Sequence, residues 1–524
     1  MKPMGAWGEG DWIAAIAVVV LGIFLALGAK IAIQKQPEFA GHPKGLYMLF
    51  FAEMWERFSY YGMRALLIFY LTKHWLFSDG KANLVYGAYT SLVYITPVLG
   101  GYLADRYLGN RKAVTFGGIL IAIGHLLMTF EGAGGQNDPT INVFWAALAF
   151  IIVGTGFLKA NISVMVGQLY KLTDVRRDGA YTIFYMGINV GAAIGTILVG
   201  YLGETIGWGY GFGLAGIGML AGLVVFVIGK GALMGAGEAP APLSKSREMS
   251  LYGIGIASVA VIWALVQYQD VIQTLLIISG VALLAYVLYE SFKLEKEPRE
   301  RMFAILFLIS LNPLFWGLFE QAGGSMSLFT DRFVDRSGTP ASLFQSINPI
   351  IIILMAPVIA VIWQWLGTRG KEPSAPVKFA LALAQMGLAN LVLVWGAQAW
   401  GIAVMTPVFL VFAYYFFATT AELCLSPVGL SAMNRLAPKF LASLIMGAWF
   451  YMTAVGNFVA GKIGEATGGH GGEMSKAKLL EVYELFGWIS IGAAVLVLLL
   501  SPIVKRWMHL DTLKDEAPVA EKAA

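Results

Sequence analysis

The chain has 524 residues, of which 58% are hydrophobic and only 13% are charged, and its mean hydropathy is +0.70. Soluble domains carry about 25% charged residues, so this composition excludes an ordinary soluble protein and indicates a polytopic membrane protein. The net charge of +4 is too small and too dispersed to suggest a nucleic-acid partner. The single Cys424 excludes a disulfide framework and a cysteine-based metal site, and the histidines show no metal-ligand spacing, so no metal is expected.

Apolar runs of about 20 residues predict the membrane-spanning helices. The first run, Trp12–Gly28, is interpreted as an extra N-terminal helix, because Glu9 and Asp11 spoil the basic leader of a signal peptide. Twelve further helices are expected, six on each side of a long middle segment. Their expected ranges are 44–72, 83–104, 112–130, 142–170, 180–202, 208–230, 303–330, 342–367, 376–397, 402–433, 440–464 and 480–504.

The expected fold is therefore an all-α polytopic membrane protein with two six-helix bundles. The middle segment holds two more apolar runs, 250–267 and 271–291, which are expected to be extra linker helices at the periphery. The predicted parts are an N-terminal extension (1–43), an N-terminal bundle (44–230), a linker (231–302), a C-terminal bundle (303–507) and a cytoplasmic tail (508–524).

Lysine and arginine are concentrated in one set of loops and are missing from the opposite loops at 131–141, 203–207 and 398–401. Basic loops lie on the cytoplasmic side of a membrane protein. Both six-helix bundles are therefore expected to start and end in the cytoplasm, and the helix at 44–72 runs from the inside to the outside.

The first of the twelve helices carries four charged residues inside an otherwise apolar stretch: Glu53, Glu56, Arg57 and Arg64. An ionisable group at membrane depth costs at least about 2.5–3.5 kcal/mol, so it usually faces a partner or a wet cavity. At about 100° per residue, these four residues and Tyr61 fall on one arc roughly 140° wide. That face cannot contact lipid, so the helix is expected to line a polar path.

Three more charges lie within apolar runs: Lys159, Glu320 and Glu422. The membrane then holds four carboxylates and three bases, so one carboxylate lacks a basic partner when all are ionised. A desolvated carboxylate without such a partner takes up a proton more readily, which indicates proton coupling. The alternative is a static network of structural ion pairs.

The depth of each charge follows from the rise of about 1.5 Å per residue. Arg64 and Glu320 are expected about 25–30 Å from the cytoplasmic side, in the outer part of the membrane. Lys159 and Glu422 lie on helices that run inward and are expected in the inner part. Each pair joins the two bundles, so the hypothesis is that Arg64–Glu320 closes the outer side and Lys159–Glu422 closes the inner side.

The loop between the second and third helices holds Gly101, the Asp105-Arg106 pair, Gly109 and Arg111. With these residues at this spacing, it resembles the signature loop of the major facilitator superfamily. An ordinary basic turn would explain the arginines but not the placement of the aspartate and the glycines. The resemblance implies two halves that rock against each other.

Two longer motifs stand out: residues 53–62 read Glu-Met-Trp-Glu-Arg-Phe-Ser-Tyr-Tyr-Gly, and residues 184–191 read Phe-Tyr-Met-Gly-Ile-Asn-Val-Gly. They resemble the ExxERFxYYG motif and the fifth-helix signature of the proton-dependent oligopeptide transporter (POT) family. The two linker helices resemble those of bacterial members. One departure is that animal members carry a histidine seven residues before the motif tyrosine, Tyr94 here, and this chain has Gly87 at that position.

The resemblance implies a role for each matching position. Arg57 would bind the carboxylate of a peptide, with Lys159 nearby, and Glu422, Asn189 and Asn348 would hold its amino group. The substrate-binding residues implied are Arg57, Tyr61, Tyr94, Lys159, Tyr185, Asn189, Trp316, Asn348, Glu422, Ser426 and Trp449. The protonation sites implied are Glu53, Glu56 and Glu422.

The function expected is a symporter that imports di- and tripeptides with protons by alternating access. It would work as a monomer in the bacterial inner membrane, with protons as the coupling ion and no cofactor. The alternatives are a proton-coupled carrier of another small substrate, such as nitrate or a peptide-like compound, and a membrane-embedded hydrolase. No Ser/His/Asp set, HExxH or Gly-x-Ser-x-Gly element favours an enzyme, and paired halves with gate charges argue against a channel or receptor.

Overall fold

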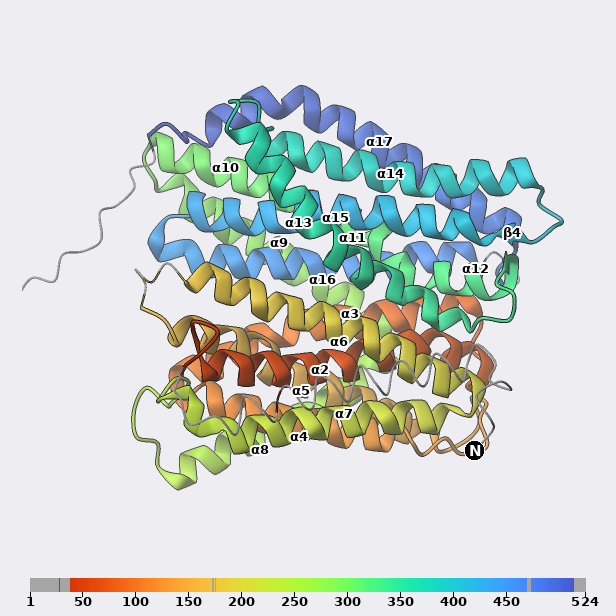
Figure 1. Cartoon of the computed structure of the whole chain (residues 1–524), viewed down its shortest axis with the longest axis horizontal. Helices are drawn as coiled ribbons and strands as arrows, with labels where there is room; N and C mark the ends of the chain where they lie inside the picture. Colours follow the sequence, from red (N-terminus) through yellow and green to blue (C-terminus); the bar gives the residue numbers. More distant parts are fainter. Residues whose placement is uncertain (1–27, 29–37, 172–173, 175, 469–472, 513–524) are drawn as a thin grey trace, which may run out of the picture.

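The computed structural model describes residue 28 and residues 38–171, 174, 176–468 and 473–512. The helix expected at 12–28, except for Gly28, and the end of the tail, 513–524, lie outside the described residues. The described chain is almost entirely helical, and its long helices lie side by side along one direction (Figure 1).

The N-terminal bundle lies in the lower half of Figure 1. Its second helix begins four residues before the predicted start, because the Ser78 side chain caps it by accepting a hydrogen bond from the backbone N–H of Lys81 at 3.4 Å. The helices are α2 (Lys44–Phe69), α3 (Asp79–Leu103), α4 (Asn110–Leu127), α5 (Ile141–Gln168), α6 (Arg177–Thr205) and α7 (Trp208–Ile228). One π-helical turn extends α2 (η2, Tyr70–His74) and another extends α3 (η3, Ala104–Leu108).

The C-terminal bundle occupies the upper half of Figure 1. Its helices are α10 (Lys296–Ser310), α11 (Asn312–Phe319), α12 (Ser325–Phe333), α13 (Ile347–Gly367), α14 (Ala375–Trp400), α15 (Val408–Leu436), α16 (Ala442–Thr467) and α17 (Lys476–Trp507).

Short 3-10 turns lie at η4 (Gly229–Leu233), η5 (Glu320–Gly323), η6 (Ala341–Ser346) and η7 (Lys439–Leu441). Two-residue strands pair β1 (Glu38–Phe39) with β2 (His42–Pro43), and β3 (Val334–Asp335) with β4 (Thr406–Pro407).

The span predicted as one helix at 303–330 is broken into α10, α11, η5 and α12. Pro313 stands at the start of α11, where its missing N–H costs least. Gly324 has φ −115° and ψ −107°, which is far from helical backbone and separates η5 from α12. The single membrane span predicted here is confirmed as Lys296–Phe333, and its interruption places Glu320 at the start of a 3-10 turn.

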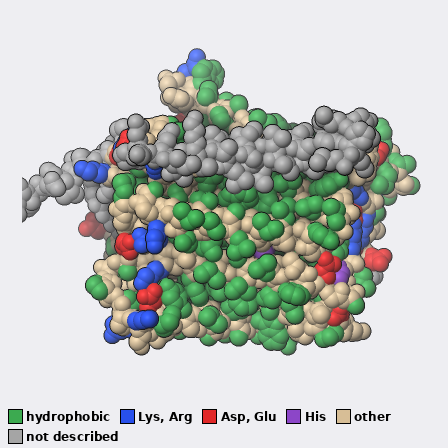
Figure 2. Space-filling view, turned by 60° about the horizontal axis from the view of Figure 1, so that its bottom comes forward, with side chains coloured by type: hydrophobic (Ala, Val, Ile, Leu, Met, Phe, Trp, Pro, Cys, Tyr) green, Lys and Arg blue, Asp and Glu red, His purple; other side chains and the backbone are tan. Residues whose placement is uncertain are grey.

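Eleven of the described helical segments are long and apolar enough to cross a membrane. These do not include α2, α3 and α4, which nevertheless run parallel to the others in the N-terminal bundle (Figure 1). The charged side chains of Glu53, Glu56, Arg57 and Arg64 lower the apolar character of α2. Figure 2 shows a broad hydrophobic face whose charged side chains gather mainly toward its two ends, as expected for a surface in lipid.

The linker helices α8 (Lys245–Gln267) and α9 (Gln269–Phe292) lie at the periphery, as predicted. Most of their large apolar side chains are exposed. Lys81 of α3 donates a hydrogen bond to the Gln269 side chain at 2.5 Å, and Ser279 of α9 lies 2.7 Å from the Tyr451 hydroxyl of α16. The linker pair therefore contacts both bundles.

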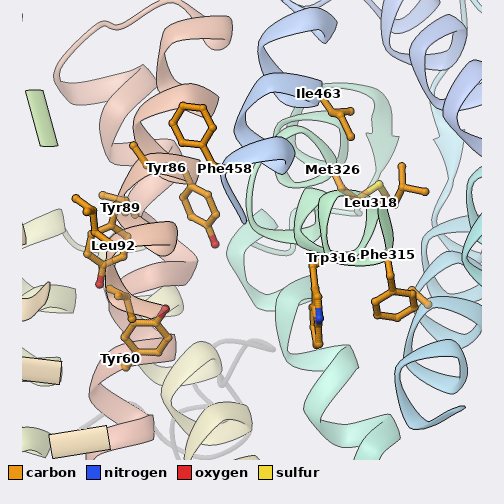
Figure 3. Packing of buried hydrophobic residues seen from close by; sticks show 14 of the residues in the cluster. Tyr60, Tyr86, Tyr89, Leu92, Phe315, Trp316, Leu318, Met326, Phe458 and Ile463 are labelled. Atoms are coloured by element: carbon orange, nitrogen blue, oxygen red, sulfur yellow. The ribbon is translucent and has the colours of Figure 1, made fainter. Parts of the chain in front are cut away.

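The two bundles approach most closely where α3 crosses α16. A Cβ atom on Gly87 would lie 2.6 Å from the Cα atom of Gly461, so only glycine fits there. The missing histidine at position 87 is thus explained by backbone packing. Figure 3 shows the buried aromatic residues near this crossing, with Tyr60 and Tyr86 on one side and Phe315 and Trp316 on the other.

Candidate functional site

An ion pair between Arg64 of α2 and Glu320 of η5 joins the two bundles in the outer part of the structure. Both side chains are buried, at 9% and 4% exposure. Arg64 also donates a hydrogen bond to the Tyr86 hydroxyl, and its guanidinium lies 5.7 Å from the centre of the Tyr61 ring. The two charges that the sequence places at the same depth are therefore in contact.

Further polar contacts, which the sequence did not predict, join the bundles nearer the outer surface. Arg332 donates two hydrogen bonds to the Asp79 carboxylate, at 2.5 and 2.7 Å, and the backbone N–H of Met474 donates a third at 2.6 Å. Lys73 pairs with Asp331 at 2.7 Å. These charges lie at helix ends, where a sequence pattern carries no signal of a distant partner.

Glu204 of α6 makes the last of these outer contacts. Its carboxylate accepts hydrogen bonds from the backbone N–H groups of Ala341 and Ser342, at 3.3 and 2.7 Å. Within the described residues, every ion pair between α2–α7 and α10–α17 lies in the outer half of the molecule.

The charged motif of α2 forms one buried cluster. The Nε atom of Arg57 lies 2.7 Å from Glu53 Oε1 and 2.8 Å from Glu56 Oε2, and all three side chains are at most 3% exposed. Glu53 Oε2 accepts no hydrogen bond within the described chain. Two carboxylates thus share one guanidinium, and the cluster carries an excess negative charge when both are ionised.

Lys159 of α5 makes no ion pair among the residues that the structure describes. Its ammonium lies 3.6 Å from the centre of the Tyr94 ring of α3, a distance at which a cation is attracted to the ring face. The contact expected between Lys159 and Glu422 is absent from the described chain, so the structure brings together the outer gate pair and not the inner one.

Glu422 of α15 instead contacts amide and hydroxyl groups. Asn348 of α13 donates a hydrogen bond to Glu422 Oε2 at 3.1 Å and lies 3.0 Å from Thr419 Oγ1. On the opposite bundle, Asn189 is buried and donates to the backbone carbonyl of Tyr185 at 3.1 Å. The two asparagines predicted to act together therefore lie on different bundles, α6 and α13.

The predicted aromatic residues differ in exposure. Tyr61 and Tyr94 are half-buried, whereas Tyr185 is 45% exposed. Trp316 is 8% exposed, and its Nε1 atom has no hydrogen-bond partner in the described chain. Trp449 is 2% exposed.

Trp449 packs closely against a neighbouring helix, because a Cβ atom on Gly429 would lie 2.0 Å from its ring. In this conformation Trp449 is a packing residue. Ser426, one turn beyond Glu422 on α15, is half-buried.

The signature loop forms the turn between α3 and α4. Gly109 has φ +78°, a conformation that favours glycine, and Asp105 accepts a hydrogen bond from the Asn110 side chain at 3.2 Å. The Arg106 guanidinium lies 5.9 Å from the Tyr102 ring centre, and Arg111 pairs with Glu238 of the linker. Gly101 faces α5, where an added Cβ would lie 3.8 Å from Ala160.

Residues 111–470 match the sequence model of the POT family. Peptide transporter YePEPT of Yersinia enterocolitica is 38% identical over 500 residues, which cover 89% of this chain and 95% of the relative. Dipeptide and tripeptide permease B of Edwardsiella piscicida is 30% identical over 485 residues, which cover 90% and 96%. A crystal structure of a mutant peptide transporter POT in complex with alafosfalin is 33% identical, with a TM-score of 0.80, and covers 92% of this chain and 99% of its own.

These relatives are transporters, so the alternative of a membrane-embedded hydrolase is excluded. The paired bundles have the major facilitator fold of the solved relatives, and the helices that can span a membrane make this a multi-pass protein of the bacterial inner membrane. The chain belongs to the POT family.

Proposed function

We propose that the protein imports di- and tripeptides together with protons by alternating access. The observation that carries this proposal is the uneven pairing of buried charges. Arg64 and Glu320 are in contact on the outer side, while Lys159 and Glu422 are apart. A carrier whose outer side alone is closed, and which holds an unpaired base and an unpaired carboxylate within the membrane, can bind both charged ends of a zwitterionic substrate.

The substrate would be held at its two charged ends. Arg57 offers a planar guanidinium for the peptide carboxylate, and Lys159 adds a second positive charge. Glu422, with Asn348 bonded to it at 3.1 Å, offers oxygen atoms for the peptide ammonium, and Asn189 adds an amide from the opposite bundle. The side chains of the peptide would contact Tyr61, Tyr94, Tyr185, Trp316 and Ser426. Trp449 would join this set only by leaving its packed position against Gly429.

Proton coupling would use carboxylates. Glu53 and Glu56 share Arg57, so protonation of one of them leaves a neutral cluster in a dry environment. Glu422 has no basic partner among the described residues and is the third protonation site. No cofactor is needed for this cycle, and one chain holds all the groups named, which supports function as a monomer.

The two gates would alternate. In this scheme the Arg64–Glu320 contact would keep the outer side closed, and we expect Lys159 and Glu422 to meet when the inner side closes and the outer pair separates. Cysteine pairs placed beside each gate should crosslink in opposite states. Crosslinking of both gates in the same state would contradict this scheme.

The deciding experiment is dipeptide addition to proteoliposomes that contain a pH-sensitive dye, with a negative-inside potential and no initial pH difference. We expect peptide-dependent acidification of the lumen, and its loss in Glu56→Gln. Glu465→Gln is the matched control, because Glu465 pairs with Lys462 at the surface, where both are exposed.

If the protein transports peptide in a counterflow assay but the lumen does not acidify, the protein is a peptide carrier that is not coupled to protons. The absence of both signals in folded protein would refute peptide import and favour another small substrate, such as nitrate, which the same liposomes can test.

A further inference from the structure

A cavity of about 490 Å³ lies between the linker helix α8 and the N-terminal bundle, away from the proposed peptide site. It is formed at the cytoplasmic ends of α4 and α7 and the start of α8. The residues that line it are Arg111, Lys112, Thr115, Phe116, Ile119, Phe226, Val227, Lys230 and Tyr252.

The cytoplasmic end of this cavity is basic. Arg111, Lys112 and Lys230 all belong to its lining, and no acidic residue does. Arg111 pairs with Glu238, and Lys112 pairs with Glu248 at 2.7 Å. Lys230 is exposed and makes no ion pair among the described residues, so the site keeps one uncompensated positive charge.

Apart from Thr115, the rest of the lining is aliphatic or aromatic. Phe116 and Tyr252 pack together with ring centres 4.9 Å apart and form one wall. Ile119 and Val227 are each 43% exposed. Ile119 lies about two turns from Lys112 along α4, and Val227 lies about one turn before Lys230. A free anion would leave this apolar surface uncovered.

We propose that the cavity binds an anionic phospholipid of the cytoplasmic leaflet. The phosphate would lie against Lys230 and Lys112, and an acyl chain would run between α4 and α8 along Phe116 and Ile119. Basic pockets between membrane helices on the cytoplasmic side recognise anionic headgroups in this way, and each basic residue near the surface contributes about fivefold in affinity.

The bound lipid would connect α8 to the N-terminal bundle. Polar contacts between them at the cytoplasmic end are few, and Lys112–Glu248 is the ion pair that joins α4 to α8 in the described chain. The lipid would add a second connection and keep the linker helix with the N-terminal half when the two halves move.

The test is native mass spectrometry of the delipidated full chain, titrated with dioleoyl phosphatidylglycerol or dioleoyl phosphatidylcholine. The two lipids share their acyl chains and differ in headgroup charge. We expect wild-type protein to retain the glycerol lipid about fivefold better than the choline lipid. Lys230→Gln should reduce this ratio to about one.

Two further variants make the result specific. Lys505→Gln is the matched control, because Lys505 is an exposed lysine at the cytoplasmic end of α17, on the opposite bundle, with no ion pair in the described chain. It should leave the ratio unchanged. Ile119→Trp fills the apolar part of the cavity and should reduce retention of both lipids.

Equal retention of the two lipids by wild-type protein would overturn the proposal. An equal fall of the retention ratio in Lys230→Gln and Lys505→Gln would overturn it as well. Inorganic phosphate or glycerol phosphate is added as a competitor at the concentration of the lipid. Displacement of the lipid by either compound would overturn the assignment to a phospholipid and indicate a site for a free anion.

Discussion

Replacing Glu320 with glutamine tests whether its contact with Arg64 keeps the outer side closed. Without the carboxylate, the buried guanidinium keeps only the Tyr86 hydroxyl and the nearby rings of Tyr61 and Tyr86. Removing one partner of a buried ion pair costs about 3–5 kcal/mol. Only the closed state bears this cost, because opening lets water reach Arg64. A cost of about 3 kcal/mol shifts the equilibrium toward the outward-open state by about 100-fold.

The assay is labelling of a single cysteine at Ser342 by a membrane-impermeant maleimide, in a Cys424→Ser background. Ser342 is 0% exposed and lies in η6 against α6, where its N–H donates to Glu204. Its hydroxyl has no hydrogen-bond partner in the described chain, so Ser342→Cys removes no such bond. Labelling from the outside should be slow in the parent and at least about tenfold faster in Glu320→Gln.

The matched control is Glu372→Gln, which removes a carboxylate paired with Lys378 at 2.5 Å within the C-terminal bundle. This variant should not change the rate of labelling at position 342. An unchanged rate in folded Glu320→Gln would refute the reasoning, because the outer side would then stay closed without the ion pair. Equal acceleration in both variants would point to general loosening and refute it as well.

Three further outcomes follow from the same contacts. Asp79→Asn weakens the two bonds from Arg332 and should lower the free energy of unfolding by about 1–2 kcal/mol, measured by denaturation in detergent micelles. Gly87→Ala places a Cβ 2.6 Å from the Cα of Gly461, so it should separate α3 from α16 and speed labelling at position 342; unchanged labelling would contradict this. His125→Ala should change peptide uptake less than about twofold, since His125 is 0% exposed and lies outside the proposed site, and uptake at background level would overturn that expectation.

The sequence predicted the parts of the site that the membrane constrains most strongly. A charge in the hydrocarbon region needs a partner or a polar cavity, so the motif of α2 could be assigned to an interior face. The regular rise of a helix then placed Arg64 and Glu320 at one depth, and the structure confirms that they touch. The same calculation for Lys159 and Glu422 stays a prediction.

The remaining features depend on tertiary contacts that no local pattern reports. The break at Gly324 separates η5, which contacts α16, from α12, which contacts η6. The Asp79–Arg332 pair joins residues 253 positions apart. The requirement for glycine at position 87 becomes clear only from the structure, in which Gly461 lies against it. The cavity proposed to bind a lipid likewise could not be predicted, because its walls come from α4, α7 and α8, which meet only in the folded chain.

The uneven pairing of charges also suggests how substrate and gate are coupled. In this structure the outer pair is satisfied, while Lys159 and Glu422 each lack an ionic partner among the described residues. While the inner side is open, these two charges are held apart within the membrane, which is costly unless each meets an opposite charge from the substrate. A peptide carries one carboxylate and one ammonium, so it can supply both partners at once. A substrate with only one charged end would leave the other charge unpaired, and this difference gives a physical reason for a carrier to select zwitterions.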